Sequence, residues 1–85
     1  MDVKILGTGC PNCQRLEKLA KEVVAEMGVE ATFTKVTDMR QIMTYDIIGT
    51  PGLVINGKVV SSGRIPPKAE VTTWVANAAA AEDGA

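Results

Sequence analysis

The sequence has 85 residues, which suffices for one folded domain, because chains usually divide into several domains only well beyond about 200 residues. Hydrophobic residues make up 46% of the chain and charged residues 22%, a composition that excludes an intrinsically disordered protein. The formal net charge of −1 provides no basic field for nucleic acid or an anionic membrane, and no apolar run reaches the ~18–20 residues that span a bilayer. The alternating N-terminal residues do not resemble a signal peptide, so we expect a cytosolic protein.

The first part of the chain predicts a strand, a long helix and a second strand. Residues 2–6 alternate between apolar and polar side chains and lead into a glycine-containing loop, which is typical of a strand followed by a turn. From Cys10 onward, apolar residues recur at helical spacing instead, with Pro11 suited to the first turn of the helix and Gly28 to its end. Residues 29–36 are rich in β-branched and aromatic side chains and predict a second strand, parallel to the first.

A β-hairpin and a last helix are predicted in the second half. Asn56-Gly57 separates the apolar runs 52–55 and 58–61, which is a strong signal for two antiparallel strands joined by a type I′ turn. Pro66-Pro67 opens a helix whose inward face is formed by Val71, Trp74, Val75 and Ala78.

A short helix is expected between the second strand and the hairpin. Asp38 can cap it, and the residues expected to fill the core from it are Met39, Ile42 and Met43. The element order is then βαβαββα, an α/β fold in which a mixed four-stranded sheet is flanked by three helices. We expect residues 1–85 to form a single domain, with residues 79–85 as a fraying tail.

The two cysteines lie three residues apart in Cys10-Pro11-Asn12-Cys13, at the start of the first helix. Residues at this spacing on a helix are roughly 5–6 Å apart, within the ~4.4–6.8 Å Cα separation of a disulfide, so the pair can close with little backbone movement. Cys10 falls at the helix N-terminus, where unpaired N–H groups stabilise a thiolate, the form that attacks a disulfide. Cys13 lies on the apolar stripe of the helix. We therefore predict that Cys10 is the attacking nucleophile and Cys13 the buried resolving thiol.

A pair of cysteines at this spacing can also serve other functions. A structural disulfide is not expected in a cytosolic protein, and a structural zinc site needs four ligands, whereas this chain has two Cys and no His. The main alternative is a soft-metal or iron–sulfur carrier, because the segment from Gly7 to Cys13 looks like the Gly-x-x-Cys-x-x-Cys loop of soft-metal chaperone domains. Those domains finish on a strand, whereas a helix is expected here. A third possibility is a redox sensor whose disulfide switches an interaction surface.

A second motif, Gly49-Thr50-Pro51-Gly52, precedes the third predicted strand. Strand–GTGCPNC–helix followed by GTPGLVINGKVVSSGR resembles the thioredoxin-like superfamily, and within it the small single-domain thioredoxins of archaea and anaerobic bacteria, over nearly the whole chain. The resemblance implies that the Thr50–Pro51 bond is cis, that Pro51 packs against the active-site sulfurs, and that Thr50 offers its backbone N–H and C=O to an extended substrate segment. Pro11 and Asn12 would support the site between the two cysteines.

The chain departs from the common family pattern at Lys4. Larger thioredoxins bury an acid six residues ahead of the first cysteine, and Lys4 occupies that position here. We expect Lys4 to lie at a sheet edge or in solvent, with a cation that favours the thiolate as the alternative. Trp74 is expected in the core, Arg64 on the solvated surface, and Tyr45 either in simple packing or at the border of the site.

The sequence thus predicts a thiol–disulfide oxidoreductase that reduces protein disulfides. The resemblance implies a cycle through a mixed disulfide, disulfide-containing proteins as substrates, and a separate thioredoxin-reductase-like enzyme that recharges the cysteine pair. We expect a monomer with no cofactor, no metal, and no nucleic-acid or membrane partner.

Overall fold

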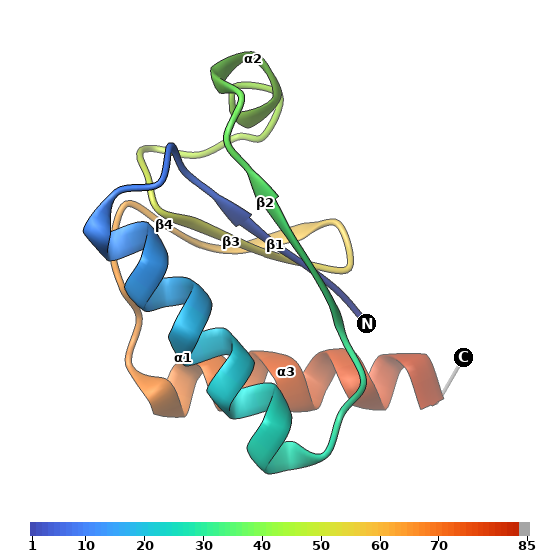
Figure 1. Ribbon diagram of the computed structural model, residues 1–85. Coiled ribbons are helices and arrows are strands. Elements are labelled where there is room, and N and C mark those ends of the chain that lie inside the picture. The colour runs from blue at the N-terminus through green and yellow to red at the C-terminus, as the bar shows by residue number, and fades with distance from the viewer. Residues whose placement is uncertain (84–85) are drawn as a thin grey trace.

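Four strands and three helices follow one another in the expected order within residues 1–83, the part of the chain that the computed structural model describes (Figure 1). They are β1 (Asp2–Leu6), α1 (Pro11–Met27), β2 (Thr32–Val36), α2 (Met39–Ile42), β3 (Gly52–Ile55), β4 (Lys58–Ser62) and α3 (Lys68–Asp83). The βαβαββα order and the mixed sheet with its three helices confirm the α/β fold expected from the sequence.

The strands are arranged in the order β2-β1-β3-β4, so β1 and β3 are the inner strands of the sheet. β1 is parallel to β2, as expected of a βαβ unit, and antiparallel to β3, which in turn pairs with β4 through the Asn56-Gly57 turn. Both turn residues have positive φ, 51° and 81°, as a type I′ turn requires. At its carboxyl end β1 pairs Leu6 with Gly52 of β3, and this register positions the functional site described below.

Apolar side chains are buried on both faces of the sheet. α1 and α3 cover one face (Figure 1), where a core forms from strand and helix residues that include Val3, Ile5, Leu53, Leu16, Val71 and Val75. The opposite face carries a smaller core, made of Leu6, Val36, Ile42 and Val54. Successive side chains of a strand point to opposite faces, which is why Ile5 and Leu6, adjacent in sequence, belong to different cores.

α1 begins and ends at the residues that the sequence indicates. Cys10 is its N-cap, Pro11 is its first residue, and Gly28 ends it in the left-handed conformation with φ 66°. The Gly28 and Val29 N–H groups donate to carbonyls of the last turn, so residues 29–31 form the connection to the next strand. β2 therefore starts at Thr32, three residues later than expected, where it begins to pair with Asp2.

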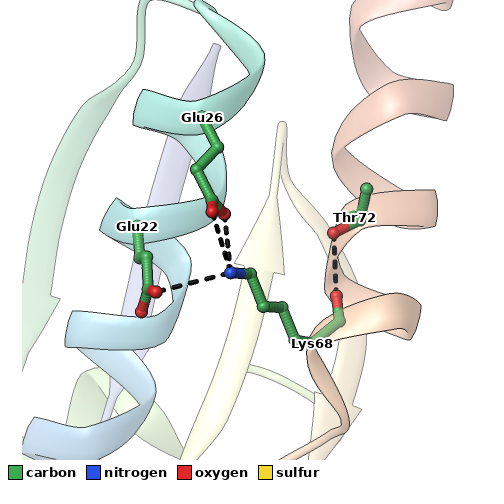
Figure 2. Close-up of polar contacts among 4 residues, drawn as sticks. All are labelled: Glu22, Glu26, Lys68 and Thr72. Atoms are coloured by element: carbon green, nitrogen blue, oxygen red, sulfur yellow. Dashed lines mark hydrogen bonds and ion pairs between the residues drawn. The ribbon is translucent and has the colours of Figure 1, made fainter.

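A cluster of charged groups joins α1 to α3 on the surface. Figure 2 shows Lys68, at the start of α3, reaching across to two carboxylates of α1: its Nζ lies 2.7 Å from Glu26 Oε2 and 3.4 Å from Glu22 Oε1. The hydrogen bond with Glu26 is the largest influence that raises the pKa of Lys68, and Glu22 adds to it. Because these groups are exposed, the cluster orients the two helices more than it stabilises them.

The expectation that Met39 and Met43 fill the core is wrong. α2 has only four residues, and one helical turn presents a single side chain to the sheet, that of Ile42. The side chains of Met39 and Met43 are 54% and 76% exposed. α3 continues through residues 79–83, where a frayed tail is expected, and the rest of that expected tail lies outside the described residues. No helix within residues 1–83 is long and apolar enough to cross a membrane.

Candidate active site

Cys10 and Cys13 form a disulfide at the N-terminus of α1, with a Cα–Cα distance of 5.1 Å. The backbone that brings them together is an ordinary first helical turn, closed by a 3.1 Å hydrogen bond from the Gln14 N–H to the Cys10 carbonyl. The three-residue spacing on the helix therefore brings the two cysteines within reach of a disulfide bond, as the sequence predicts. Pro11 and Asn12, between the two cysteines, are exposed on this turn.

The two sulfurs have different surroundings. Cys10 is the N-cap residue, with extended backbone angles, and its Sγ accepts a 3.2 Å hydrogen bond from the Cys13 N–H. No acidic residue lies in the first turn of α1 to oppose a negative charge there. Cys13 is 5% exposed and lies on the buried side of the helix with Leu16 and Ala20. The structure thus confirms the expected helix-capping position of Cys10 and the burial of Cys13.

Gly7 lies against the Cys13 sulfur, a contact that the sequence does not reveal. A Cβ atom added at Gly7 would overlap Cys13 Sγ, would lie 3.2 Å from Cys13 Cβ and would approach Thr50 Cβ to 4.0 Å. The Gly7 N–H donates to Val36 O at 3.0 Å, which fixes the backbone in this place. Glycine is required here because any side chain would take the space that the sulfur occupies.

The Thr50–Pro51 bond is cis, as the resemblance implies, and the motif lies at the same end of the sheet as the cysteines. The pairing of Gly52 with Leu6 brings the segment before β3 alongside Gly7, so that Thr50 borders the space next to Cys13 Sγ. Pro51 is buried, and its carbonyl accepts a 3.0 Å hydrogen bond from the Gly63 N–H. Thr50 is exposed and remains open to a binding partner.

A small pocket of about 70 Å³ opens beside Cys13, and the sequence does not predict it. Gly7, Glu17 and Lys35 are among the residues that line it with Cys13. Glu17 is four residues after Cys13, a spacing that puts both on one face of α1, and this was the available sequence signal. Its carboxylate lies 3.5 Å from the Nζ of Lys35 on β2.

Lys4 is not at a sheet edge, because β1 is an inner strand. Its side chain is partly exposed and lies 3.6 Å from the Asp2 carboxylate. Hydrogen bonding and electrostatic attraction to Tyr45, followed by attraction to Asp2, raise the pKa of Lys4. Lys4 is not among the residues lining the pocket beside Cys13, so the alternative role as a cation for the thiolate has no support from the geometry.

The structure also shows where Tyr45, Trp74 and Arg64 lie. Tyr45 packs against the smaller core and also lines a groove that reaches Thr50, so it combines the two expected roles. Trp74 packs against the larger core while remaining partly exposed. Arg64 is exposed and pairs with Glu70 at 2.9 Å.

The geometry favours disulfide exchange over metal carriage. Two sulfurs at disulfide distance, one at a helix N-terminus and one buried, form instead a pair that can open and close.

Comparison with known proteins agrees with this chemistry. The family model described as a thioredoxin domain matches residues 1–76. A thioredoxin of Methanothermobacter thermautotrophicus is 44% identical over 71 residues, which cover 84% of this chain and 92% of the relative. A thioredoxin of Methanocaldococcus jannaschii is 36% identical over 69 residues, 81% of this chain and 79% of the relative. The fold, the cysteine pair and these similarities together show that the chain belongs to the thioredoxin family and is a thiol–disulfide oxidoreductase.

Proposed function

We propose that this protein reduces disulfides of other proteins, with Cys10 as the nucleophile and Cys13 as the resolving thiol. In the reduced protein the Cys10 thiolate attacks a substrate disulfide, forms a mixed disulfide and releases one substrate thiol. Cys13 then attacks the Cys10 sulfur, which releases the second substrate thiol and closes the Cys10–Cys13 disulfide. A separate reductase of the thioredoxin-reductase type returns the pair to the dithiol, and no cofactor of this chain's own is involved.

The observation that carries the proposal is the difference between the two sulfurs. Cys10 Sγ already accepts the N–H of Cys13, and the orphan N–H groups at the start of a helix favour a negative charge on it. Cys13 is 5% exposed, and burial in apolar surroundings disfavours the thiolate and restricts access. A partner arriving from solvent therefore meets Cys10 first.

Thr50 and Pro51 support the binding of an extended substrate segment. Thr50 is exposed next to the Cys13 side of the pair, at the entrance to β3, where a partner strand can form backbone hydrogen bonds. Buried Pro51 fixes this segment against the end of the sheet, and Pro11 and Asn12 form the exposed rim on the helix side.

We further propose that the protein acts as a monomer in the cytoplasm.

Alkylation of the reduced protein tests the assignment of roles. At neutral pH, a limiting amount of iodoacetamide should modify Cys10 well before Cys13, as followed by peptide mass spectrometry. Faster labelling of Cys13 would refute the assignment. Iodoacetamide treatment of the denatured protein is the control, because both thiols should then react at similar rates.

Trapping variants extend the test to substrates. Cys13→Ser should retain partner proteins as mixed disulfides, because Cys10 can attack but nothing releases it, whereas Cys10→Ser should retain almost none. Equal capture by both variants would contradict the proposal. The wild-type protein should also reduce insulin in the presence of dithiothreitol, and wild-type protein that purifies with a stoichiometric metal would favour the carrier function instead.

A further inference from the structure

The pocket beside Cys13 contains the groups needed to take a proton from the resolving thiol. Cys13 must lose its proton before or during its attack on the mixed disulfide, yet it is 5% exposed and lies away from bulk water. The pocket of about 70 Å³ that it lines has room for several water molecules, each of which needs roughly 10–15 Å³. Glu17, whose side chain ends in a carboxylate, is among the residues that line the same pocket.

Glu17 is held in this place from two sides. Its side chain is only 16% exposed, and its two carboxylate oxygens lie 3.5 Å from Lys35 Nζ on β2 and 3.8 Å from Lys21 Nζ on α1. Lys21 is itself placed over the ring of Phe33, 5.7 Å from its centroid. Lys35 also lines the pocket, so Glu17, Lys35 and Cys13 all border one small volume.

We propose that Glu17 accepts the proton of the Cys13 thiol, through water in this pocket, during the resolving step. The Cys13 sulfur bonds to the Cys10 sulfur, the bond between Cys10 and the substrate sulfur breaks, and its electron pair leaves with the substrate thiolate. The Cys13 proton passes to the Glu17 carboxylate and from there to solvent. This inference rests on the proposed roles of the two cysteines. It places the proton acceptor on α1, whereas larger thioredoxins bury an acid on the first strand, at the position that Lys4 occupies here.

A two-phase reaction with dithiobis(nitrobenzoate) separates the resolving step from the first attack. Cys10 of the reduced protein releases one coloured nitrothiobenzoate in a phase whose rate depends on reagent concentration. Cys13 then displaces the second from Cys10 in a phase that does not depend on it. Glu17→Gln should slow the second phase at pH 7 by about tenfold, below the 10²–10⁴-fold typical of a directly positioned acid or base because water intervenes. The first phase should change less than twofold.

The pH dependence identifies proton transfer as the cause. The difference between Glu17→Gln and the wild type should shrink as pH rises well above the free-thiol value of about 8.5, because the buried thiol then ionises without help from a carboxylate. Glu17→Asp, which keeps a carboxylate, should recover part of the rate. Glu17→Gln/Lys35→Gln should be as slow as Glu17→Gln, which excludes a mere change in the charge of the pocket. Glu30→Gln, the same change at an exposed position beyond the far end of α1, is the matched control.

The cysteine variants test the roles of Cys10 and Cys13, and the Glu17 variants test the proton acceptor. If Cys13→Ser gives no first phase, or Cys10→Ser gives one as fast as the wild type, the cysteine roles themselves are wrong. If both roles hold and the second phase of Glu17→Gln is unchanged, or is slowed equally at every pH, the inference about Glu17 is overturned. Thermal unfolding of each variant, followed by circular dichroism, ensures that the rates compare folded proteins.

Discussion

Gly7→Ala should weaken the Cys10–Cys13 disulfide more than it weakens the fold. The added methyl group would overlap Cys13 Sγ and lie 3.2 Å from Cys13 Cβ. In the oxidised protein the sulfur is tied to Cys10 and cannot turn away, whereas in the reduced protein the Cys13 side chain can rotate about χ1. The steric cost therefore falls mainly on the disulfide form.

The magnitude follows from the cost of overpacking a filled site. An extra methyl group in a well-packed core costs about 1–3 kcal/mol. If the oxidised form bears this cost alone, the reduction potential rises by roughly 20–65 mV, since about 30 mV corresponds to 1.4 kcal/mol for a two-electron couple. The Tm of the oxidised protein should fall by about 4–8 °C for each kcal/mol, as in domains of this size, and that of the reduced protein by less.

Gly52→Ala is the matched control for this experiment. Its added Cβ would lie 3.2 Å from Leu6 Cδ1, so it also overpacks a core, but it touches neither sulfur. Titration of each protein in dithiothreitol redox buffers, and thermal unfolding with and without reductant, give the two quantities. Gly52→Ala should lower the stability of both redox forms equally and leave the potential unchanged. The same behaviour from Gly7→Ala would refute the reasoning.

Three further predictions concern the helices and the redox pair. Lys68→Gln should lower Tm slightly at pH 7. Because the folded protein raises the pKa of Lys68, the stabilisation is present below the ordinary value of 10.5 and is lost as pH rises past it, so Tm measured against pH should converge for the two proteins. Ile42→Ala should cost about 2–5 kcal/mol in urea unfolding, whereas exposed Met43→Ala should stay within about 0.5; equal costs would show that α2 buries both. The Cys10–Cys13 midpoint should lie nearer about −270 mV than −120 mV, because no His lies between the cysteines to stabilise the thiolate further, and a midpoint above roughly −180 mV would contradict this.

Most of the fold could be predicted because its signals are local and agree with one another. The helical period of α1 is bounded by Pro11 and Gly28, two residues with positional meanings that do not depend on the rest of the protein. Asn56-Gly57 likewise fixes the hairpin by its own backbone preferences. The redox pair is local in the same sense, because three-residue spacing on a helix is enough to place two sulfurs within bonding reach.

The errors and omissions arise where one segment meets another. Met39 and Met43 fit the pattern of a core-facing helix, but the pattern does not contain the length of α2, and a single turn buries Ile42 alone. From the sequence, Gly7 is interpreted as a flexible loop residue. It must be a glycine because Cys13, which follows on the helix, occupies the space that a side chain would take. The spacing of four residues puts Glu17 on the same face of α1 as Cys13. The pocket that gives Glu17 a role, however, is also lined by Lys35 from the neighbouring strand β2, which the sequence of α1 alone does not reveal.

The register of β1 against β3 links the stability of this small protein to its chemistry. Leu6 pairs with Gly52, so the chain that enters β3 through Thr50 and Pro51 arrives beside Gly7, next to the sulfur of Cys13. A shift of one residue would exchange the two faces of β3 and move Leu53 out of the larger core, which makes the register costly to change. Apolar residues are buried on both faces of the sheet at this pairing, so either core opposes a slip. Two motifs far apart in sequence are thus kept together by the same packing that holds the sheet.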